Sequence, residues 1–200
     1  MVDVKTHRVF PTIISEFHYD MDAEEKQRVI NHLLSSDDVD TTSDIIQTGD
    51  KLNVQIPKFT KHISEVANKI LKDTFLYKYD KIELTGMWAN HCIANDTHPP
   101  HTHSNNIISG VYYVEAKDES PIQFFDPRPQ ASVLHPNMTA TNFDNSGMIQ
   151  FDSEEGFGLM FPSWLQHWVP RVQSNRMSIS WNILLRGDYG QPGTLQNSHI

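Results

Sequence analysis

Cysteine is almost absent from this sequence of 200 residues. The single cysteine, Cys92, has no second thiol in the chain with which to form a disulfide, and stabilising disulfides are typical of proteins from oxidising compartments. The composition therefore gives no sign of an oxidising environment. We interpret Cys92 as a small buried apolar residue and not as a nucleophile.

Basic residues and long apolar runs are also scarce. The chain has 16 Lys and Arg against 25 Asp and Glu, a formal net charge of -9, and affinity for nucleic acid depends on Lys and Arg. A broad nucleic-acid surface is therefore disfavoured, although a local basic pocket is compatible with this charge. No stretch is apolar for long enough to span a bilayer, and the N-terminus lacks a basic region followed by an apolar run. We expect a cytoplasmic protein without a membrane partner.

No internal repeat, low-complexity tract or linker divides the chain. We therefore expect one domain over residues 1–200, with a helical N-terminal part over about 1–80 and a β core over about 81–186. A short strand is predicted near residues 9–14. After it, Asp22 and Glu25 have the spacing of a capping box, which marks the start of a helix.

Two helices are predicted from stripes of apolar residues. The first helix follows Asp22, and its apolar face contains Val29, Ile30, Leu33 and Leu34. The second has one stripe with a period of about 3.6 residues, made of Ile63, Val66, Ala67, Ile70 and Leu71. We expect both helices to pack on the outside of a sheet.

From about residue 81 the sequence changes to short β-rich runs. They are separated by Pro, Asn, Asp and Gly, and read IELTGMWANHC, IISGVYYVEA, PIQFFD, GMIQFD, FGLMFP, HWVPRV and RMSISWNILL. Many short strands with turn residues between them predict a sandwich or barrel, and not alternating βαβ units. The predicted fold class is α+β, with two N-terminal helices followed by an antiparallel jelly roll.

Histidine is the one residue type in excess, with 11 in the chain. His101 and His103 stand two residues apart, so on an extended strand both side chains leave the same face and can meet one ion. The two prolines between His98 and His101 impose extended backbone, and the odd spacing predicts that His98 lies on the opposite face. For His-x-His alone, solvated loop histidines are an equally good interpretation.

A second segment strengthens the metal interpretation. His167 opens a strand after Pro162, and Arg176 follows nine residues later. Arg176 and Ser178 stand two apart and share a strand face. Burial of a guanidinium beside a hydroxyl costs free energy unless an anion binds to it. The planar guanidinium can donate two parallel hydrogen bonds to the two oxygens of a carboxylate. An ion pair between Arg176 and an acidic side chain of the chain is the structural alternative.

Together these segments resemble the motifs of the iron(II)- and 2-oxoglutarate-dependent oxygenase superfamily. The pattern is Trp-x-Asn at Trp88 and Asn90, then His-x-His, SGVYY, and FPSWLQH with an arginine nine residues on. It resembles in particular oxygenases of marine bacteria and cyanophages, over most of the chain from about residue 10 to residue 182. The resemblance implies a double-stranded β-helix, the cupin-like jelly roll. It also implies a dioxygenase that hydroxylates a substrate and releases succinate and carbon dioxide.

The resemblance implies roles for individual residues as well. His101, His103 and His167 would be the catalytic ligands of Fe(II), and Arg176 with Ser178 would bind the far carboxylate of the co-substrate 2-oxoglutarate. Where most members of the superfamily have a carboxylate ligand, this chain has His103. The site would then hold three neutral imidazoles and no anionic protein ligand.

Other positions carry weaker signals. We expect Asn90, on the preceding strand, to line the same cavity. Tyr112 and Tyr113 alternate across one strand, so one of them faces the cavity, and Tyr113 is the candidate for binding the co-substrate. Asp126 and Arg128 stand at a strand exit, where a turn or a surface ion pair is the favoured role.

Two other functions fit part of the pattern. A cupin-like three-histidine metal enzyme would use no 2-oxoglutarate, but the cupin glutamate expected shortly after His103 is missing and Arg176 would have no role. A catalytically silent jelly-roll binding module would explain the missing carboxylate ligand, but not three correctly spaced histidines. For the oxygenase, we expect dioxygen and an unidentified small molecule or protein side chain as further substrates.

Overall fold

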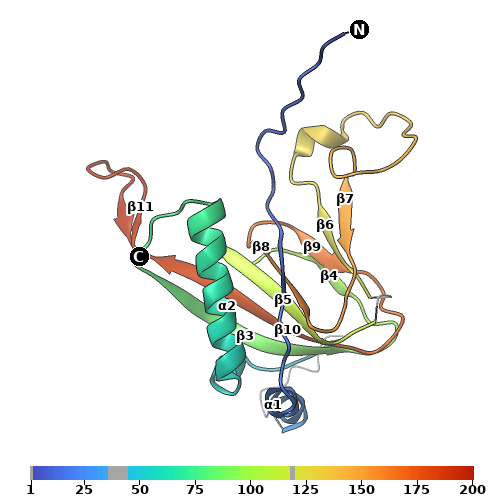
Figure 1. Ribbon diagram of the computed structural model, residues 1–200, viewed down its shortest axis with the longest axis vertical. Helices are drawn as coiled ribbons and strands as arrows, with labels where there is room; N and C mark the ends of the chain where they lie inside the picture. The colour runs from blue at the N-terminus through green and yellow to red at the C-terminus, as the bar shows by residue number, and fades with distance from the viewer. Residues whose placement is uncertain (1, 36–44, 118–119) are drawn as a thin grey trace.

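The computed structural model describes residues 2–35, 45–117 and 120–200. Its strands form two facing antiparallel sheets (Figure 1). The larger sheet contains, in spatial order, β1 (Ser15–His18), β8 (Phe157–Pro162), β5 (Ile108–Glu115), β10 (Arg176–Arg186), β3 (Lys81–Cys92) and β2 (Ile46–Gln47). The smaller contains β4 (His98–His101), β9 (His167–Val169), β6 (Ile122–Phe125) and β7 (Met148–Phe151). A separate hairpin near the C-terminus pairs β11 (Asp188–Tyr189) with β12 (Ser198–His199). The predicted double-stranded β-helix is confirmed.

Apolar side chains from both sheets meet between them and hold the β-helix together. Tyr113 of β5 and Phe161 of β8 belong to the same buried cluster as Ile122 and Phe124 of β6. The ring centroids of Phe124 and Phe161 are 4.9 Å apart, in edge-to-face contact. Burial of this apolar surface keeps the smaller sheet against the larger one.

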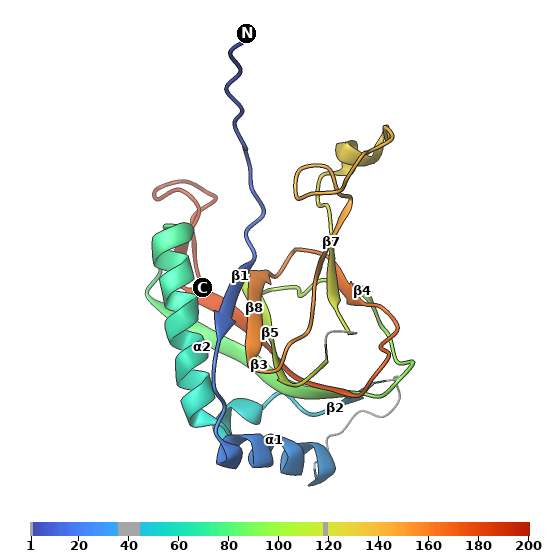
Figure 2. The same ribbon diagram turned by 45° about the vertical axis from the view of Figure 1, so that its right-hand side comes forward.

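A helical layer covers the outer face of the larger sheet (Figure 2). It contains α1 (Ala23–Ser35), α2 (Pro57–Lys69), a short 3₁₀ turn at Leu52–Val54 and a π turn at Ile70–Thr74, while a further 3₁₀ turn at Pro129–Ser132 lies between β6 and β7. Phe59 of α2 and Trp181 of β10 are fully buried against each other. The Trp181 ring also lies over Gly110, where a Cβ atom would come within 2.3 Å of it. None of the described helices is of a length and apolarity that could cross a membrane.

The two helices are joined by a buried carboxylate. Asp22 caps α1 as predicted, because its Oδ1 accepts a hydrogen bond of 2.9 Å from the Glu25 backbone N–H. The Glu25 side chain, however, accepts bonds from the backbone N–H groups of Lys58 at 2.9 Å and Phe59 at 3.2 Å. It also accepts a bond of 3.0 Å from the Tyr19 hydroxyl. Glu25 therefore caps the start of α2, where no local side chain does so.

Most predicted elements are present, with two corrections in the N-terminal part. Residues 9–14 form no strand, and the first strand begins at Ser15, because Phe10 has a positive φ of 56° and Pro11 has no N–H to donate. Leu34 is 81 % exposed and lies off the apolar face of α1. The first 80 residues are also not purely helical, since β1 and β2 complete the two edges of the larger sheet. The division into a single domain stays a prediction.

Removing the Glu25 carboxylate tests its role as the link between the helices. Glu25 is 1 % exposed, so Glu25→Ala leaves two helix N–H groups and a tyrosine hydroxyl without their acceptor. We expect the free energy of unfolding, measured by urea denaturation, to fall by about 2 kcal/mol. The control is Glu24→Ala, which removes only an exposed ion pair with Arg28 and should cost about 0.5 kcal/mol or less. Equal losses in the two variants would contradict the capping role.

Candidate metal and co-substrate site

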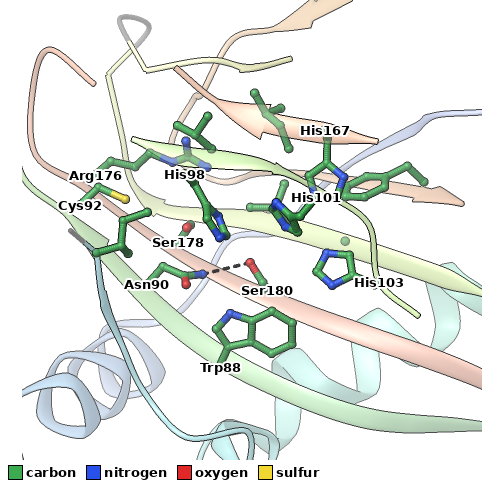
Figure 3. Close-up of a pocket in the computed structure, with 16 residues that line it drawn as sticks. Trp88, Asn90, Cys92, His98, His101, His103, His167, Arg176, Ser178 and Ser180 are labelled. Carbon is green, nitrogen blue, oxygen red and sulfur yellow. Dashed lines mark hydrogen bonds between the residues drawn. The ribbon is translucent and has the colours of Figure 1, made fainter. Parts of the chain in front are cut away.

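Strand alternation directs a set of polar side chains into the space between the sheets. On β10, Met177, Ile179 and Trp181 belong to the outer core, so the residues between them face inward. These inward residues are Arg176, Ser178 and Ser180, and Asn90 and Ser180 are joined by a hydrogen bond of 3.0 Å (Figure 3). Trp88, Asn90 and Cys92 of the adjacent strand β3 line the same cavity. Cys92 is buried, as predicted.

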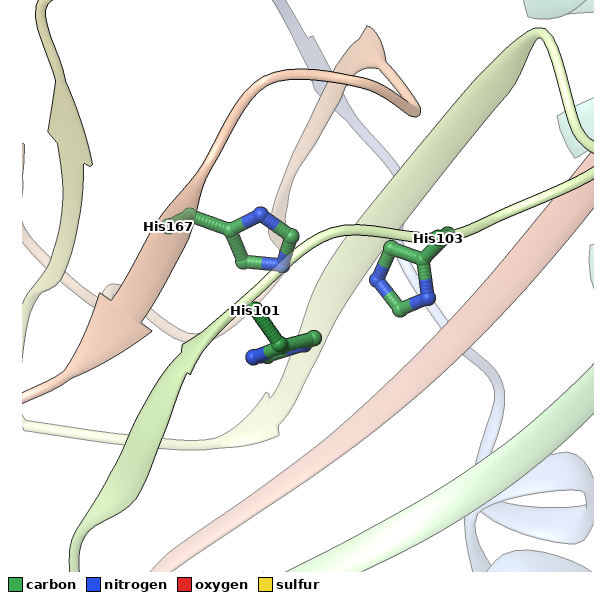
Figure 4. Close-up of side chains that lie close together, drawn as sticks. All are labelled: His101, His103 and His167. Atoms are coloured by element: carbon green, nitrogen blue, oxygen red, sulfur yellow. The ribbon is translucent and has the colours of Figure 1, made fainter.

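Three histidines meet at one end of this cavity (Figure 4). His101 at the end of β4 is the direct cross-strand partner of His167 at the start of β9. His103 follows two residues after His101, where its backbone N–H donates to the Ser163 carbonyl at 2.9 Å. One ring nitrogen from each of the three histidines lies within 4.8 Å of the others. This spacing allows all three to bind a single metal ion from one side.

Backbone carbonyls fix the orientation of two of these rings. The Nδ1 atom of His101 lies 2.8 Å from the Pro99 carbonyl oxygen, and the Nδ1 atom of His167 lies 2.9 Å from the Leu165 carbonyl oxygen. A ring nitrogen that faces a carbonyl must carry the proton, so the lone pair is on Nε2. Both rings therefore present an unprotonated nitrogen, which is the arrangement found for histidines that bind metals.

Burial keeps the cluster uncharged. Burial, together with the neighbouring histidines, lowers the pKa of His167 to about 3 and that of His103 to about 4. The pKa of His101 is lowered by burial and partly restored by its bond to Pro99. All three rings are thus neutral at pH 7, and no proton has to leave before their lone pairs can bind an ion.

Arg176 provides the positive charge at the other end of the cavity. It is 3 % exposed, and its guanidinium lies 4.7 Å from the centre of the Tyr113 ring. Its Nη1 donates to the Ser120 carbonyl at 3.3 Å, while its buried Nε has no hydrogen-bond partner among the described residues. No carboxylate in the described parts of the chain forms an ion pair with it. The predicted alternative of an internal ion pair is therefore not found among these residues, and a carboxylate ligand would compensate the buried charge.

Of the residues with weaker sequence signals, some line the cavity and others do not. Asn90 lines the cavity as predicted. Tyr113 points into the β-helix, whereas Tyr112 faces the helical layer and donates to the Tyr19 carbonyl at 2.9 Å. Tyr113 packs against Arg176 and does not itself line the cavity, and in the described parts of the chain its buried hydroxyl has no hydrogen-bond partner. Ser180 was missed by the sequence analysis, although it continues the two-residue period of Arg176 and Ser178.

Asp126 and Arg128 form the predicted surface pair at the exit of β6. The Asp126 carboxylate accepts bonds of 2.9 Å and 2.8 Å from the Arg128 side chain, and a bond of 2.9 Å from the Arg128 backbone N–H. This guanidinium lowers the pKa of the Asp126 carboxyl. The pair needs no ligand to be satisfied, in contrast to Arg176.

The prediction that His98 lies on the opposite face from His101 is wrong. Its side chain lines the cavity, and its ring centroid lies 4.3 Å from that of His101. In the pairing of β4 with β9, His98 lies opposite Val169 and His101 opposite His167, so three steps on β4 match two on β9. This is a β-bulge, and the extra residue turns an odd spacing into a shared face. Pro99 and Pro100, which donate no hydrogen bond, occupy the bulge.

The depressed histidine pKa values predict how stability depends on pH. In the unfolded chain a histidine has a pKa of about 6.5, so between pH 7 and pH 5 the unfolded state takes up protons that folded His167 does not. Stability conferred by this neutral ring is complete above pH 6.5 and falls as the pH is lowered, by about 2 kcal/mol at pH 5. In metal-free protein, His167→Asn should reduce the loss in unfolding free energy between pH 7 and pH 5 by that amount. The exposed His135→Asn is the control, and equal losses in wild type and His167→Asn would refute the expectation.

Comparison with known proteins agrees with the geometry of the site. Residues 86–182, just under half of the chain, match the family model described as "Putative 2OG-Fe(II) oxygenase". None of the curated proteins compared with the chain matches it. The predicted closeness to proteins of marine bacteria and cyanophages stays a prediction.

Solved structures of low sequence identity share the fold. An oxidoreductase of the 2OG-Fe(II) oxygenase family from Burkholderia pseudomallei has a TM-score of 0.61 at 10% identity, covering 86% of this chain and 84% of that one. A prolyl-4-hydroxylase from Pseudomonas putida has a TM-score of 0.58 at 12% identity, covering 88% and 94%.

A third solved structure contains bound ligands. HygX from Streptomyces hygroscopicus, with nickel, 2-oxoglutarate and hygromycin B bound, has a TM-score of 0.59 at 10% identity, covering 87% of this chain and 83% of that one. At such identities the likeness shows the fold alone, while the family match spans the strands that carry the histidines and Arg176. The chain is thus similar in fold to these oxygenases, and over residues 86–182 it is similar in sequence to the 2OG-Fe(II) oxygenase family.

Proposed function

We propose that the chain is an iron(II)- and 2-oxoglutarate-dependent dioxygenase. The observation that supports this most strongly is the pairing, in one cavity, of a compact three-histidine cluster with a buried arginine that has no described carboxylate partner. Imidazole nitrogens suit iron(II), and three ligands on one side of the ion leave its other positions for small molecules. HygX, which shares this fold, binds 2-oxoglutarate together with a metal.

Each residue has a separate role in the proposal. His101, His103 and His167 hold the ion through their neutral nitrogens. Arg176 binds the far carboxylate of 2-oxoglutarate with two parallel N–H groups, and Ser178 adds its hydroxyl. With iron(II) and dioxygen, 2-oxoglutarate supplies an oxidative decarboxylation that yields succinate and carbon dioxide and delivers one oxygen atom to a substrate.

Arg176 contributes position and charge. Its guanidinium has a fixed orientation, because one face packs against the Tyr113 ring and Nη1 donates a hydrogen bond to the Ser120 carbonyl. Fixed geometry matters because a displacement of about an ångström can cost on the order of a hundredfold in rate. Asn90, bonded to Ser180, is oriented toward the same space and is proposed to contact the co-substrate.

The all-histidine donor set favours one second candidate, a cupin-like metal enzyme that uses no 2-oxoglutarate. Such an enzyme gives no role to Arg176, whose burial without a described counter-ion would then be an uncompensated cost. A cytoplasmic location, and a small molecule or protein side chain as the hydroxylated substrate, stay predictions from the sequence.

Replacing Arg176 separates the two candidates. Arg176→Leu should weaken the binding of 2-oxoglutarate to Mn(II)-loaded protein by about a hundredfold or more, because a buried charge pair loses one partner. Binding of Mn(II) itself should be unchanged, since the guanidinium is no metal ligand. Calorimetry measures both affinities, with Arg171→Leu, an exposed arginine, as the matched control. Equal 2-oxoglutarate affinity in wild type and Arg176→Leu would reject the anchor and favour the cupin-like enzyme.

The metal ligands are tested by single substitutions. His101→Ala, His103→Ala and His167→Ala should each weaken metal binding by roughly a hundredfold or more, whereas His98→Ala should retain the metal. His103→Asp restores the carboxylate usual in the superfamily and should also retain it. Iron content after anaerobic reconstitution, measured without a polyhistidine tag, gives the result. Loss of iron in His98→Ala with retention in His103→Ala would overturn the assignment.

A further inference from the structure

The imidazole of His98 lies between the two halves of the proposed site. In Figure 3 its ring is placed between the Arg176 guanidinium and the histidine cluster, beside Ser178 and above Asn90. It lines the same cavity as these residues and is in ring contact with His101, at 4.3 Å between centroids. It is not one of the three histidines whose nitrogens converge. A molecule that spans from Arg176 to the cluster must therefore pass through the space that His98 occupies.

The remaining space is too small for such a molecule. The cavity has a free volume of about 40 Å³, and a water molecule needs roughly 10–15 Å³ on this measure. About three water molecules would fill it. 2-Oxoglutarate has ten non-hydrogen atoms, so it does not fit while the ring is in this position.

The backbone of His98 is fixed, but its side chain is not. The strand around it is held by pairing with Val169 and by the neighbouring Thr97, whose hydroxyl donates to the Val169 carbonyl at 2.9 Å. No hydrogen bond to any residue in the described ranges holds the imidazole. Rotation about its side-chain bonds would vacate the volume of a whole ring, at the small cost of exchanging one rotamer for another.

We propose that His98 is a gating residue, whose ring in its observed position occupies part of the co-substrate site and must turn out before 2-oxoglutarate can bind. The inference rests on the proposed function, because it takes Arg176 and the three histidines as the two ends of the co-substrate site. It assigns His98 no contact with the bound co-substrate. The fraction of molecules with the ring turned out then limits the apparent affinity for 2-oxoglutarate.

Titration of 2-oxoglutarate into Mn(II)-loaded protein tests this, with affinity measured by calorimetry and association rate by stopped flow. His98→Ala empties the position and should bind about fivefold more tightly and associate faster than wild type. His98→Phe keeps a ring of similar size and should not gain affinity. His135→Ala, an exposed histidine outside the cavity, should behave as wild type. Metal content, measured for each variant, shows that the site still folds.

The outcomes separate the gate from the proposed function. Weaker or unchanged binding in His98→Ala, with wild-type binding that depends on Arg176, would overturn the gate and leave the oxygenase site intact. Such a result would make His98 a contact of the co-substrate or a bystander. Absence of 2-oxoglutarate binding in both wild type and His98→Ala would overturn the proposed function and the gate with it. Binding in His98→Ala alone would support both.

Discussion

The buried charge of Arg176 is the constraint on which the site depends. A guanidinium taken out of water is costly unless its donors are satisfied, and here one carbonyl and the face of Tyr113 compensate only part of that cost. The described surroundings contribute no negative charge, since the nearby histidines are neutral and the serines and Asn90 are uncharged. A dianionic ligand would supply what is missing, and its second end would reach the histidine cluster.

The fold brings these groups together by strand alternation in β3 and β10 and by the pairing of β4 with β9. Every second residue of β3 and β10 points into the β-helix, while the residues between them anchor the helical layer outside. With three neutral imidazoles, Fe(II), Arg176 and dianionic 2-oxoglutarate would together carry a net charge of about +1, where a carboxylate ligand would make it zero. A histidine in place of a carboxylate at position 103 would therefore raise the charge of the proposed centre by one.

The sequence predicted those features that depend on local periodicity. The β-rich runs correspond to strands, and the two-residue spacings correctly placed His101 with His103 and Arg176 with Ser178. The same rule failed for His98, because it assumes a regular strand and the proline-containing bulge adds a residue. Glu25 was predicted to cap its own helix, yet it caps the next one. That contact joins residues far apart in the chain, and no local pattern encodes it.

The central claim, that this cavity converts 2-oxoglutarate with iron, is tested most directly by measuring succinate. Purified protein reconstituted with Fe(II) should convert 2-oxoglutarate slowly to succinate and carbon dioxide even without its hydroxylated substrate, since decarboxylation uncoupled from hydroxylation is a common leak in this chemistry. Succinate should form only when Fe(II) and dioxygen are both present. Consumption of dioxygen with another small molecule, without succinate from 2-oxoglutarate under any condition, would contradict the account.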